Sequence, residues 1–404
     1  MSFQTGLSGL NASSRSLDVI GNNIANANTT GMKSSRTEFG DLVASSLGAA
    51  GGSSGAGIGV AVEAIAQQFT QGNINTTGNS LDVAINGGGF FQLTQTDGSL
   101  AYTRDGSFKL DKDGYIITNS GANVMGYPTD TAGNTTSTAI EALQLPTSAP
   151  IAAKETTAIT AEFNLDARAV VATSVTPNTP RTTYGTALTV YDSQGAEVPV
   201  NLYFTRAATT TTDNWDVYDV ASGGTPLFQM QFDANGALVS PTTSPTLTIA
   251  TPSAVTPDIT ATLDISNVTQ FGSAFAVSNL TQDGYAPGEL TGITIGDSGV
   301  ITTRYSNGQT QFKGQLALAD FRNVQGLQPL GSNAWAATYA SGDPVQGAPG
   351  AGRFGSLRSG ALEESNVDLT SELVNMMTAQ RTYQANAQTI KTQDQIMSTL
   401  VNLR

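Results

Sequence analysis

The sequence of 404 residues contains neither cysteine nor histidine. Without a thiol, disulfide bonds and cysteine nucleophiles are excluded, and without an imidazole no Ser-His-Asp triad or histidine-ligated metal site can form. Charged residues make up only 12% of the chain, about half of the usual share of roughly 25%. We therefore expect no enzyme activity, no catalytic, cofactor-binding or metal-binding residues, and no cofactor.

Long apolar runs and basic surfaces are missing as well. No run approaches the 18 or so apolar residues of a membrane span, so we expect no membrane insertion. The chain has 32 acidic and 18 basic residues and a net charge of -14, which disfavours nucleic acid as a partner. The first 31 residues lack the basic start, apolar block and cleavage site of a secretory signal peptide.

Each end of the chain instead carries an apolar pattern with alternating spacings of four and three residues. This pattern predicts a helix at each end, and two such patterns favour pairing of the helices as a coiled coil. An alternative is that each helix packs on a domain of its own. We name these apolar positions the assembly seam, and it comprises Phe3, Leu7, Leu10, Leu17, Ile24, Leu369, Leu373, Met376, Tyr383, Ile390, Met397 and Val401.

The middle of the chain reads as short strands separated by turns. Asp-Gly at 97–98, 105–106 and 113–114, and Asn-Gly at 235–236 and 307–308, supply the positive φ that tight hairpin turns need. Residues 48–59 have the Gly/Ser composition of a flexible linker. The expected fold is therefore multidomain and mainly β, with sandwich- or barrel-like outer domains and helices at both ends.

Proline clusters divide the β region. Pro146 and Pro150 close one part and Pro287 opens another, so we expect an inserted outer β domain at 146–284. The flanking pieces 71–145 and 285–355 then form one discontinuous β domain. Residues 1–30 and 366–404 form the helical domain, and 31–70 with 356–365 form a linker region.

Motifs for chemistry are weak. Asp111 to Gly114 resembles the start of a calcium loop, but its glycine comes too early and no Glu stands at the twelfth position, so a hairpin turn is favoured. Glu363 and Glu364 are adjacent, so on a helix they point apart and cannot flank one bond as an acid–base pair. We expect them to be a charge pair at the start of the C-terminal helix.

Three groups of motifs carry a resemblance to the bacterial flagellar rod and hook family. The N-terminal motif reads SGLNA at 8–12, LDVIGNNIAN at 17–26 and TGMK at 30–33, with Met where the family usually has an aromatic residue. The C-terminal motif reads SNVDL at 365–369, ELV at 372–374, AQRTYQANA at 379–387 and TQD at 392–394. Residues 81–91 and 102–108 are similar to the family's first β domain, and the long insertion is typical of its hook members.

The resemblance implies a structural subunit that polymerises with itself into a flexible tube and transmits torque from rod to filament. It also implies export through the flagellar type III apparatus without a cleaved signal, and an extracellular place in the hook. Implied partners are further copies of the chain, the distal rod protein, the hook cap, the hook–filament junction proteins and the export apparatus. Alternatives are another axial subunit, such as a distal rod or hook-associated protein, or a secreted β-rich binding module or enzyme.

Overall fold

A computed structural model describes residues 2–43, 57–130, 132–146, 150–171, 181–207, 213–252 and 255–402. The chain divides into two compact units. Unit 1 comprises Met1–Ser148, Gly292–Arg304 and Thr310–Arg404, and unit 2 comprises Ala149–Thr291 and Tyr305–Gln309.

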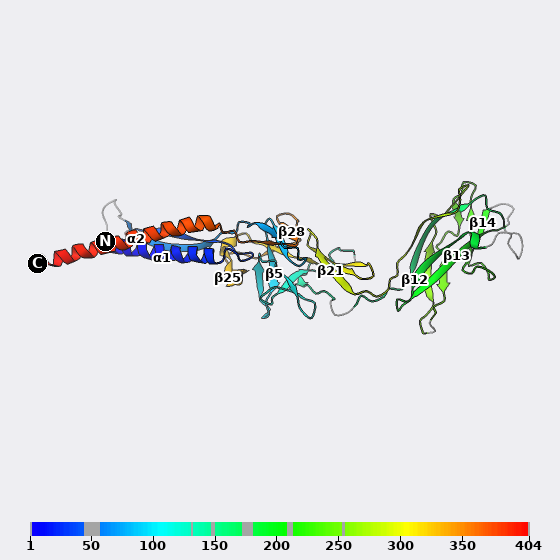
Figure 1. Ribbon diagram of the computed structural model, residues 1–404, viewed down its shortest axis with the longest axis horizontal. Coiled ribbons are helices and arrows are strands. Elements are labelled where there is room, and N and C mark those ends of the chain that lie inside the picture. The colour runs from blue at the N-terminus through cyan, green and yellow to red at the C-terminus, as the bar shows by residue number, and fades with distance from the viewer. Residues whose placement is uncertain are drawn as a thin grey trace. The chain divides into compact units, whose positions relative to one another are not determined.

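Unit 1 begins and ends with its two long helices, α1 (Ser2–Ala25) and α2 (Leu369–Asn402), which lie side by side (Figure 1). The side chain of Asp368 accepts hydrogen bonds from the Thr370 and Ser371 amides at 2.9 and 3.3 Å. It therefore caps the first turn of α2, whose amide groups have no partner within the helix. The prediction that the terminal helices pair is confirmed.

A long β-hairpin follows α1. Strands β1 (Ser35–Val43) and β2 (Gly57–Gln67) pair antiparallel, with Ser35 opposite Gln67. The hydroxyl of Ser8 on α1 accepts a hydrogen bond from the Val60 amide at 3.3 Å, so β2 lies against α1. Residues 31–70 are thus largely strand rather than the predicted linker, because the valine and isoleucine in 58–65 favour extended backbone. The glycine- and serine-rich stretch lies mostly outside the described residues.

The β core of unit 1 is a 13-stranded sheet. Its central path runs in the order β21-β22-β23-β9-β5-β6-β26-β25, and β7, β8, β10, β24 and β27 pair beside that path. The strands of this sheet are β5 (Phe90–Thr94), β6 (Leu100–Thr103), β7 (Lys109–Leu110), β8 (Ile116–Ile117), β9 (Asn123–Tyr127), β10 (Glu141–Ala142), β21 (Leu290–Ile295), β22 (Val300–Tyr305), β23 (Thr310–Leu316), β24 (Leu318–Asp320), β25 (Gln328–Gly331), β26 (Ala334–Ala336) and β27 (Val345–Gly347).

Two small sheets bring the returning chain back to its first third. Strand β28 (Ser356–Ser359) pairs with β4 (Val83–Asn86), and β29 (Ala361–Glu363) pairs with β3 (Ile74–Thr76). A short 3-10 helix, η3 (Val324–Gly326), precedes β25. The pairing of β29 with β3 holds the segment that precedes α2 beside the segment that follows β2. The N-terminal and C-terminal parts of the chain therefore meet in the same part of unit 1.

Most of the predicted hairpin turns are present. Gly98, Gly114, Gly236 and Gly308 have φ values between 80° and 84°, the left-handed region that a glycine adopts without strain. The turn at Asp105-Gly106 was predicted wrongly. A glycine is needed at position 106 because the backbone there lies very close to the backbone of Val83. A Cβ atom on residue 106 would overlap the carbonyl oxygen of Val83.

Unit 2 is built from two five-stranded sheets around one apolar core. In the first sheet, β11 pairs with β18 and β19 in parallel and with β20 antiparallel, and β17 pairs with β18. In the second, β12 to β16 follow one another in order. The elements of unit 2 are β11 (Ala158–Asp166), η2 (Arg181–Thr183), β12 (Gly185–Tyr191), β13 (Glu197–Ala207), β14 (Asp213–Tyr218), β15 (Phe228–Phe232), β16 (Leu238–Ser240), β17 (Thr246–Ile249), β18 (Ile259–Asp264), β19 (Thr269–Phe271) and β20 (Ala276–Gln282).

Asp283 joins the first and last segments of unit 2. Its carboxylate accepts hydrogen bonds from Lys154 Nζ at 2.8 Å and from the Thr157 and Ala158 amides at 2.8 and 2.9 Å. Burial by itself raises the pKa of Asp283, but the hydrogen bonds from Lys154, Ala158 and Thr157 outweigh it and leave the pKa well below its usual value. The charged carboxylate therefore stabilises the folded unit.

Replacement of Asp283 by asparagine tests this stabilisation as a function of pH. We expect the wild type to exceed Asp283→Asn in free energy of unfolding by about 1–3 kcal/mol at neutral pH. Because the folded pKa lies below the unfolded value near 4, the difference is complete above pH 4 and shrinks as the pH falls below it. Denaturant titrations of both proteins between pH 7 and 2 measure the difference. A difference that does not change with pH would contradict the assignment.

The predicted fold class, multidomain and mainly β with terminal helices that pair, is confirmed. Unit 2 overlaps most of the predicted insertion at 146–284 but also includes the turn Tyr305–Gln309. That turn was not predicted to belong there, because its contacts are distant in sequence. The amide of Asn307 donates a hydrogen bond to the Ala286 carbonyl at 2.6 Å, which ties the turn to the end of unit 2.

Candidate assembly surface on the terminal helices

The contact between α1 and α2 includes small residues of α1 and both Asn386 and Ile390 of α2. A Cβ atom on Gly6 would approach Ile390, and one on Gly9 would approach the amide of Asn386. The same Asn386 amide lies 3.5 Å from the Ser13 hydroxyl. Because glycine and serine add little bulk, the two helix backbones come close together.

One residue of the assembly seam, Ile390, takes part in this contact, whereas several others are exposed. Phe3, Leu7, Leu369, Leu373, Tyr383 and Met397 are exposed, whereas Leu10, Leu17, Ile24, Met376 and Ile390 are half-buried. Leu373 and Phe3 each keep 50% of their surface exposed. The side chain of Val401 lies outside the described residues.

The seam of α1 and the face of α1 that contacts α2 are displaced from each other for a simple geometric reason. Gly6 and Gly9 each precede a seam position, Leu7 or Leu10, by one residue. One residue is a rotation of about 100° around a helix axis. The helices therefore pair, but α1 turns a neighbouring face toward α2. Phe3 and Leu7 stay exposed, and the other seam residues of α1 are half-buried.

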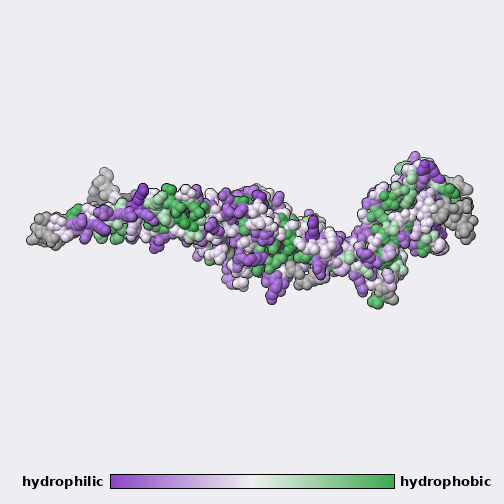
Figure 2. Space-filling view, in the orientation of Figure 1, coloured by the Kyte–Doolittle hydropathy of each residue, from purple (hydrophilic) through white to green (hydrophobic). Residues whose placement is uncertain are grey.

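Two exposed residues of the α2 surface were missed in the sequence pattern. Val374 and Met377 are both about half exposed and extend the apolar surface beside Leu369 and Leu373. The spacing of Met377, four residues after Leu373, is the signal that could have identified it. Figure 2 shows apolar side chains gathered over this N-terminal half of α2.

The C-terminal end of α2 extends beyond the start of α1. Gly6, near the beginning of α1, faces Ile390, and α2 continues to Asn402. In Figure 1 the red end of α2 runs past the mark of the N-terminus. Ile396 and Met397 lie on this extension and are about half exposed. The extension is a second apolar surface of the same helix.

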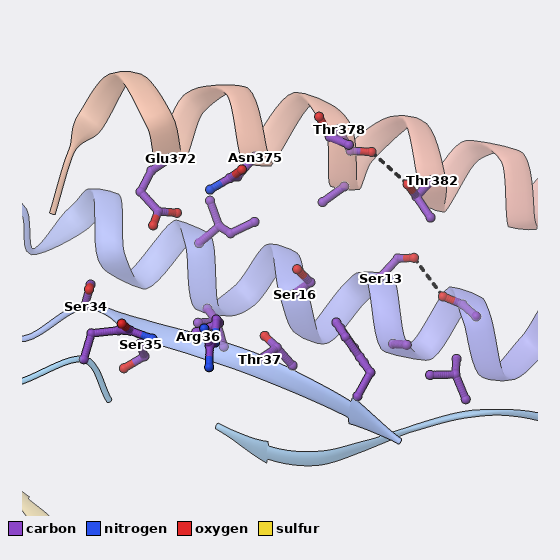
Figure 3. Close-up of a pocket in the computed structure, with 18 of the residues that line it drawn as sticks. Ser13, Ser16, Ser34, Ser35, Arg36, Thr37, Glu372, Asn375, Thr378 and Thr382 are labelled. Carbon is purple, nitrogen blue, oxygen red and sulfur yellow. Dashed lines mark hydrogen bonds between the residues drawn. The ribbon is translucent and has the colours of Figure 1, made fainter. Parts of the chain in front are cut away.

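A cavity of about 860 Å³ lies beside the helix pair. Figure 3 shows Ser13 and Ser16 from α1, Thr378 and Thr382 from α2, and Ser34 and Thr37 at β1 around it. Its lining is mostly hydroxyl and amide groups and also includes the charged residues Arg36 and Glu372. Such a lining binds polar groups or water, and it presents no nucleophile paired with a base.

A buried ionic cluster stands at the base of the helices. The Glu363 carboxylate, which is 0% exposed, accepts hydrogen bonds from Lys33 Nζ at 2.6 Å and from an Arg104 Nη at 3.2 Å. Burial lowers the pKa of Lys33, and the neighbouring Glu363 carboxylate partly offsets this effect. The predicted charge pair at a helix start is therefore wrong: Glu363 ends strand β29, and Asp368 caps α2.

The described part of the chain offers neither a metal site nor a membrane-spanning helix. No group of three or more acidic side chains there is arranged to hold a metal ion. The helices in that part of the chain lack the apolar length needed to cross a membrane.

Four family descriptions match the chain in order. Residues 3–33 match "Flagella basal body rod protein", and residues 84–168 match "Flagellar hook protein FlgE/F/G D1 domain". Residues 164–285 match "Flagellar basal body protein FlaE D2 domain", and residues 358–403 match "Flagellar basal body rod FlgEFG protein C-terminal". The flagellar hook protein FlgE of Escherichia coli K12 is 41% identical over 418 aligned residues, which cover all of both chains.

The chain belongs to the flagellar hook protein family. The hook protein FlgE of Salmonella typhimurium is 42% identical and that of Treponema pallidum 33% identical, and both align with all of this chain. The alignments cover 100% and 99% of those relatives. The resemblance predicted from the terminal motifs is thus confirmed.

A solved structure supports the fold. The Helicobacter pylori flagellar hook protein FlgE2 superposes with a TM-score of 0.55 at 16% identity. The match covers 72% of this chain and 100% of that one. At this identity the likeness concerns the fold alone.

Proposed function

We propose that this protein is a structural subunit of the bacterial flagellar hook and assembles with copies of itself into a helical tube. The observation that carries the proposal is the outward apolar surface of the paired helices. The two helices are already paired through Gly6, Gly9 and Asn386, yet Phe3, Leu373 and four further seam residues remain exposed. Membership of the hook protein family agrees with this reading.

The exposed seam supplies a driving force for assembly. Burial of one leucine side chain contributes about 1.5–3 kcal/mol, and the surface carries several large apolar residues. When a surface of one copy binds a different surface of the next without closing a ring, the result is a helical filament. The N-terminal half of α2 and its C-terminal extension are two such surfaces on one chain.

The domain organisation follows from this arrangement. We place residues 1–30 and 366–404 around the lumen of the tube and the β domains, at 71–145 with 285–355 and at 146–284, outside it. Bending of a tube that transmits torque requires outer contacts that slide. Small polar side chains suit such contacts better than interlocking apolar ones, which have discrete packings, and charged residues are only 12% of this chain.

The remaining partners rest on the family. We propose that the subunit contacts the distal rod protein, the hook cap and the hook–filament junction proteins at the ends of the tube. We also propose an extracellular place in the flagellum, reached through the type III export apparatus without a cleaved signal, and no catalytic activity.

Electron microscopy of the purified full chain under polymerising conditions tests the proposal. Short curved tubes are the expected result. Straight rods would instead favour another axial subunit of the flagellum. Particles that never polymerise, combined with hydrolysis of a polysaccharide, would favour a secreted enzyme.

A further inference from the structure

Three segments that are distant in sequence meet at Glu363. The Glu363 carbonyl accepts a hydrogen bond from the Gly31 amide at 2.8 Å, and its carboxylate accepts one from the Gly72 amide at 2.9 Å. Lys33, on the same segment as Gly31, reaches the carboxylate at 2.6 Å and the Thr70 carbonyl at 2.8 Å. The segments are 31–34 after α1, 68–73 after β2, and 361–366 before α2.

Asn366 makes a second connection among the same segments. Its side-chain oxygen accepts a hydrogen bond from the Ser34 amide at 2.8 Å. Its side-chain nitrogen donates to the Gln68 carbonyl at 2.7 Å and to the Thr70 hydroxyl at 2.8 Å. Each segment is therefore held by the other two as well as by the β core.

Two cations bond to one carboxylate at this point. Lys33 and Arg104 both donate to Glu363, and the side chains of all three are at most 5% exposed. The Asp320 carboxylate adds a smaller attraction to Arg104 and forms no hydrogen bond with it. The Arg104 guanidinium also lies over the Phe90 ring, 5.3 Å from its centre, which places it on the β core. Loss of the carboxylate leaves two buried cations, whereas loss of either cation leaves a neutral pair.

We propose that Glu363 is a latch that closes the three segments onto the β core in one cooperative step. Glu363 is buried with its charge neutralised only when Lys33 arrives from the N-terminal side and Gly72 and Arg104 are in place. If one segment is displaced, the others must bury an unpaired charge or leave the core themselves. The inference concerns a single chain, so its outcome does not depend on whether the chain polymerises.

Hydrogen exchange of the full-length monomer, read by mass spectrometry, tests the latch. We expect Glu363→Gln to accelerate exchange at least about tenfold in all three segments together, while exchange in β5 stays unchanged. The matched control is Arg36→Met. Arg36 lies three residues after Lys33 in the sequence, and its replacement removes an exposed ion pair with Glu38. The control should leave segments 68–73 and 361–366 as in the wild type.

The deciding variant is Lys33→Met. Lys33→Met should accelerate exchange in segment 361–366, although Glu363 lies 330 positions from Lys33 in the sequence. The acceleration should be smaller than in Glu363→Gln, because a neutral Glu363–Arg104 pair remains. Arg104→Met should act in the same way, so the test stands even if Glu363→Gln does not fold. Exchange that rises only in the substituted segment, or equally in β5, would overturn the proposal.

Discussion

Replacement of Leu373 by aspartate is expected to abolish tube formation and to leave the melting temperature of the monomer nearly unchanged. Leu373 is 50% exposed in the single chain and lies among the apolar residues of α2, beside Leu369 and Met377. If neighbouring copies cover this surface, the new charge is buried without a partner, which costs several kcal/mol at each contact. In the monomer the same charge stays in water.

The matched control is Thr389→Asp. Thr389 is also exposed on α2, but it lies 16 residues further along, about 160° around the helix axis from Leu373. We expect Thr389→Asp to polymerise, although both variants gain one negative charge. Sedimentation of polymer and calorimetry of monomer measure the two effects. A Leu373→Asp protein that forms tubes would place the seam elsewhere, and one that melts far lower would place Leu373 in a contact within its own chain.

Replacement of Trp215 by alanine should weaken unit 2 by about 3–5 kcal/mol, because it removes a large, fully buried side chain and leaves a cavity. Trp215 is 0% exposed in strand β14 and packs edge-on against Tyr184 with ring centres 5.7 Å apart. The sheets on both sides of it share one core, so the cavity lies where relaxation is most restricted.

The second tryptophan makes this prediction specific to one unit. The chain has only two tryptophans, and Trp335 lies in unit 1, where its indole donates a hydrogen bond to Gln67 at 2.6 Å. In Trp215→Ala, circular dichroism should show β structure unfolding at a lower temperature than in the wild type. The fluorescence of Trp335 should change at the same temperature as in the wild type. Val239→Ala, at an exposed site of unit 2, should change neither. Simultaneous melting by both probes would show that the two units do not unfold independently.

Local patterns predicted the local structure well. The apolar spacing located both helices, and Gly98 and Gly114 occupy the left-handed turns expected of them. Such features depend on residues within a few positions of one another, so the sequence contains their causes. The hairpin of β1 and β2 was missed because the glycine-rich stretch between its strands dominated the composition.

Features that depend on distant residues were not predictable. The contact of Gly9 with Asn386 and the pairing of Lys33 with Glu363 each join the two ends of the chain. A single helix pattern shows which face is apolar, but it does not show which face meets the partner, and here the two faces differ by one residue. Glu363 looked like half of a charge pair because its neighbour Glu364 is also acidic.

The meeting of three segments at Glu363 has a mechanical consequence. Two parts of a protein that are joined by one peptide segment can rotate relative to each other, because the φ and ψ angles of that segment turn with little resistance. Here two segments of the chain, 68–73 and 361–366, leave the helical end of unit 1 beside each other and are bonded to one another. The turn at 31–34 is bonded to both of them. Segments that are bonded to one another cannot rotate separately, so the junction resists twisting about the helix axis.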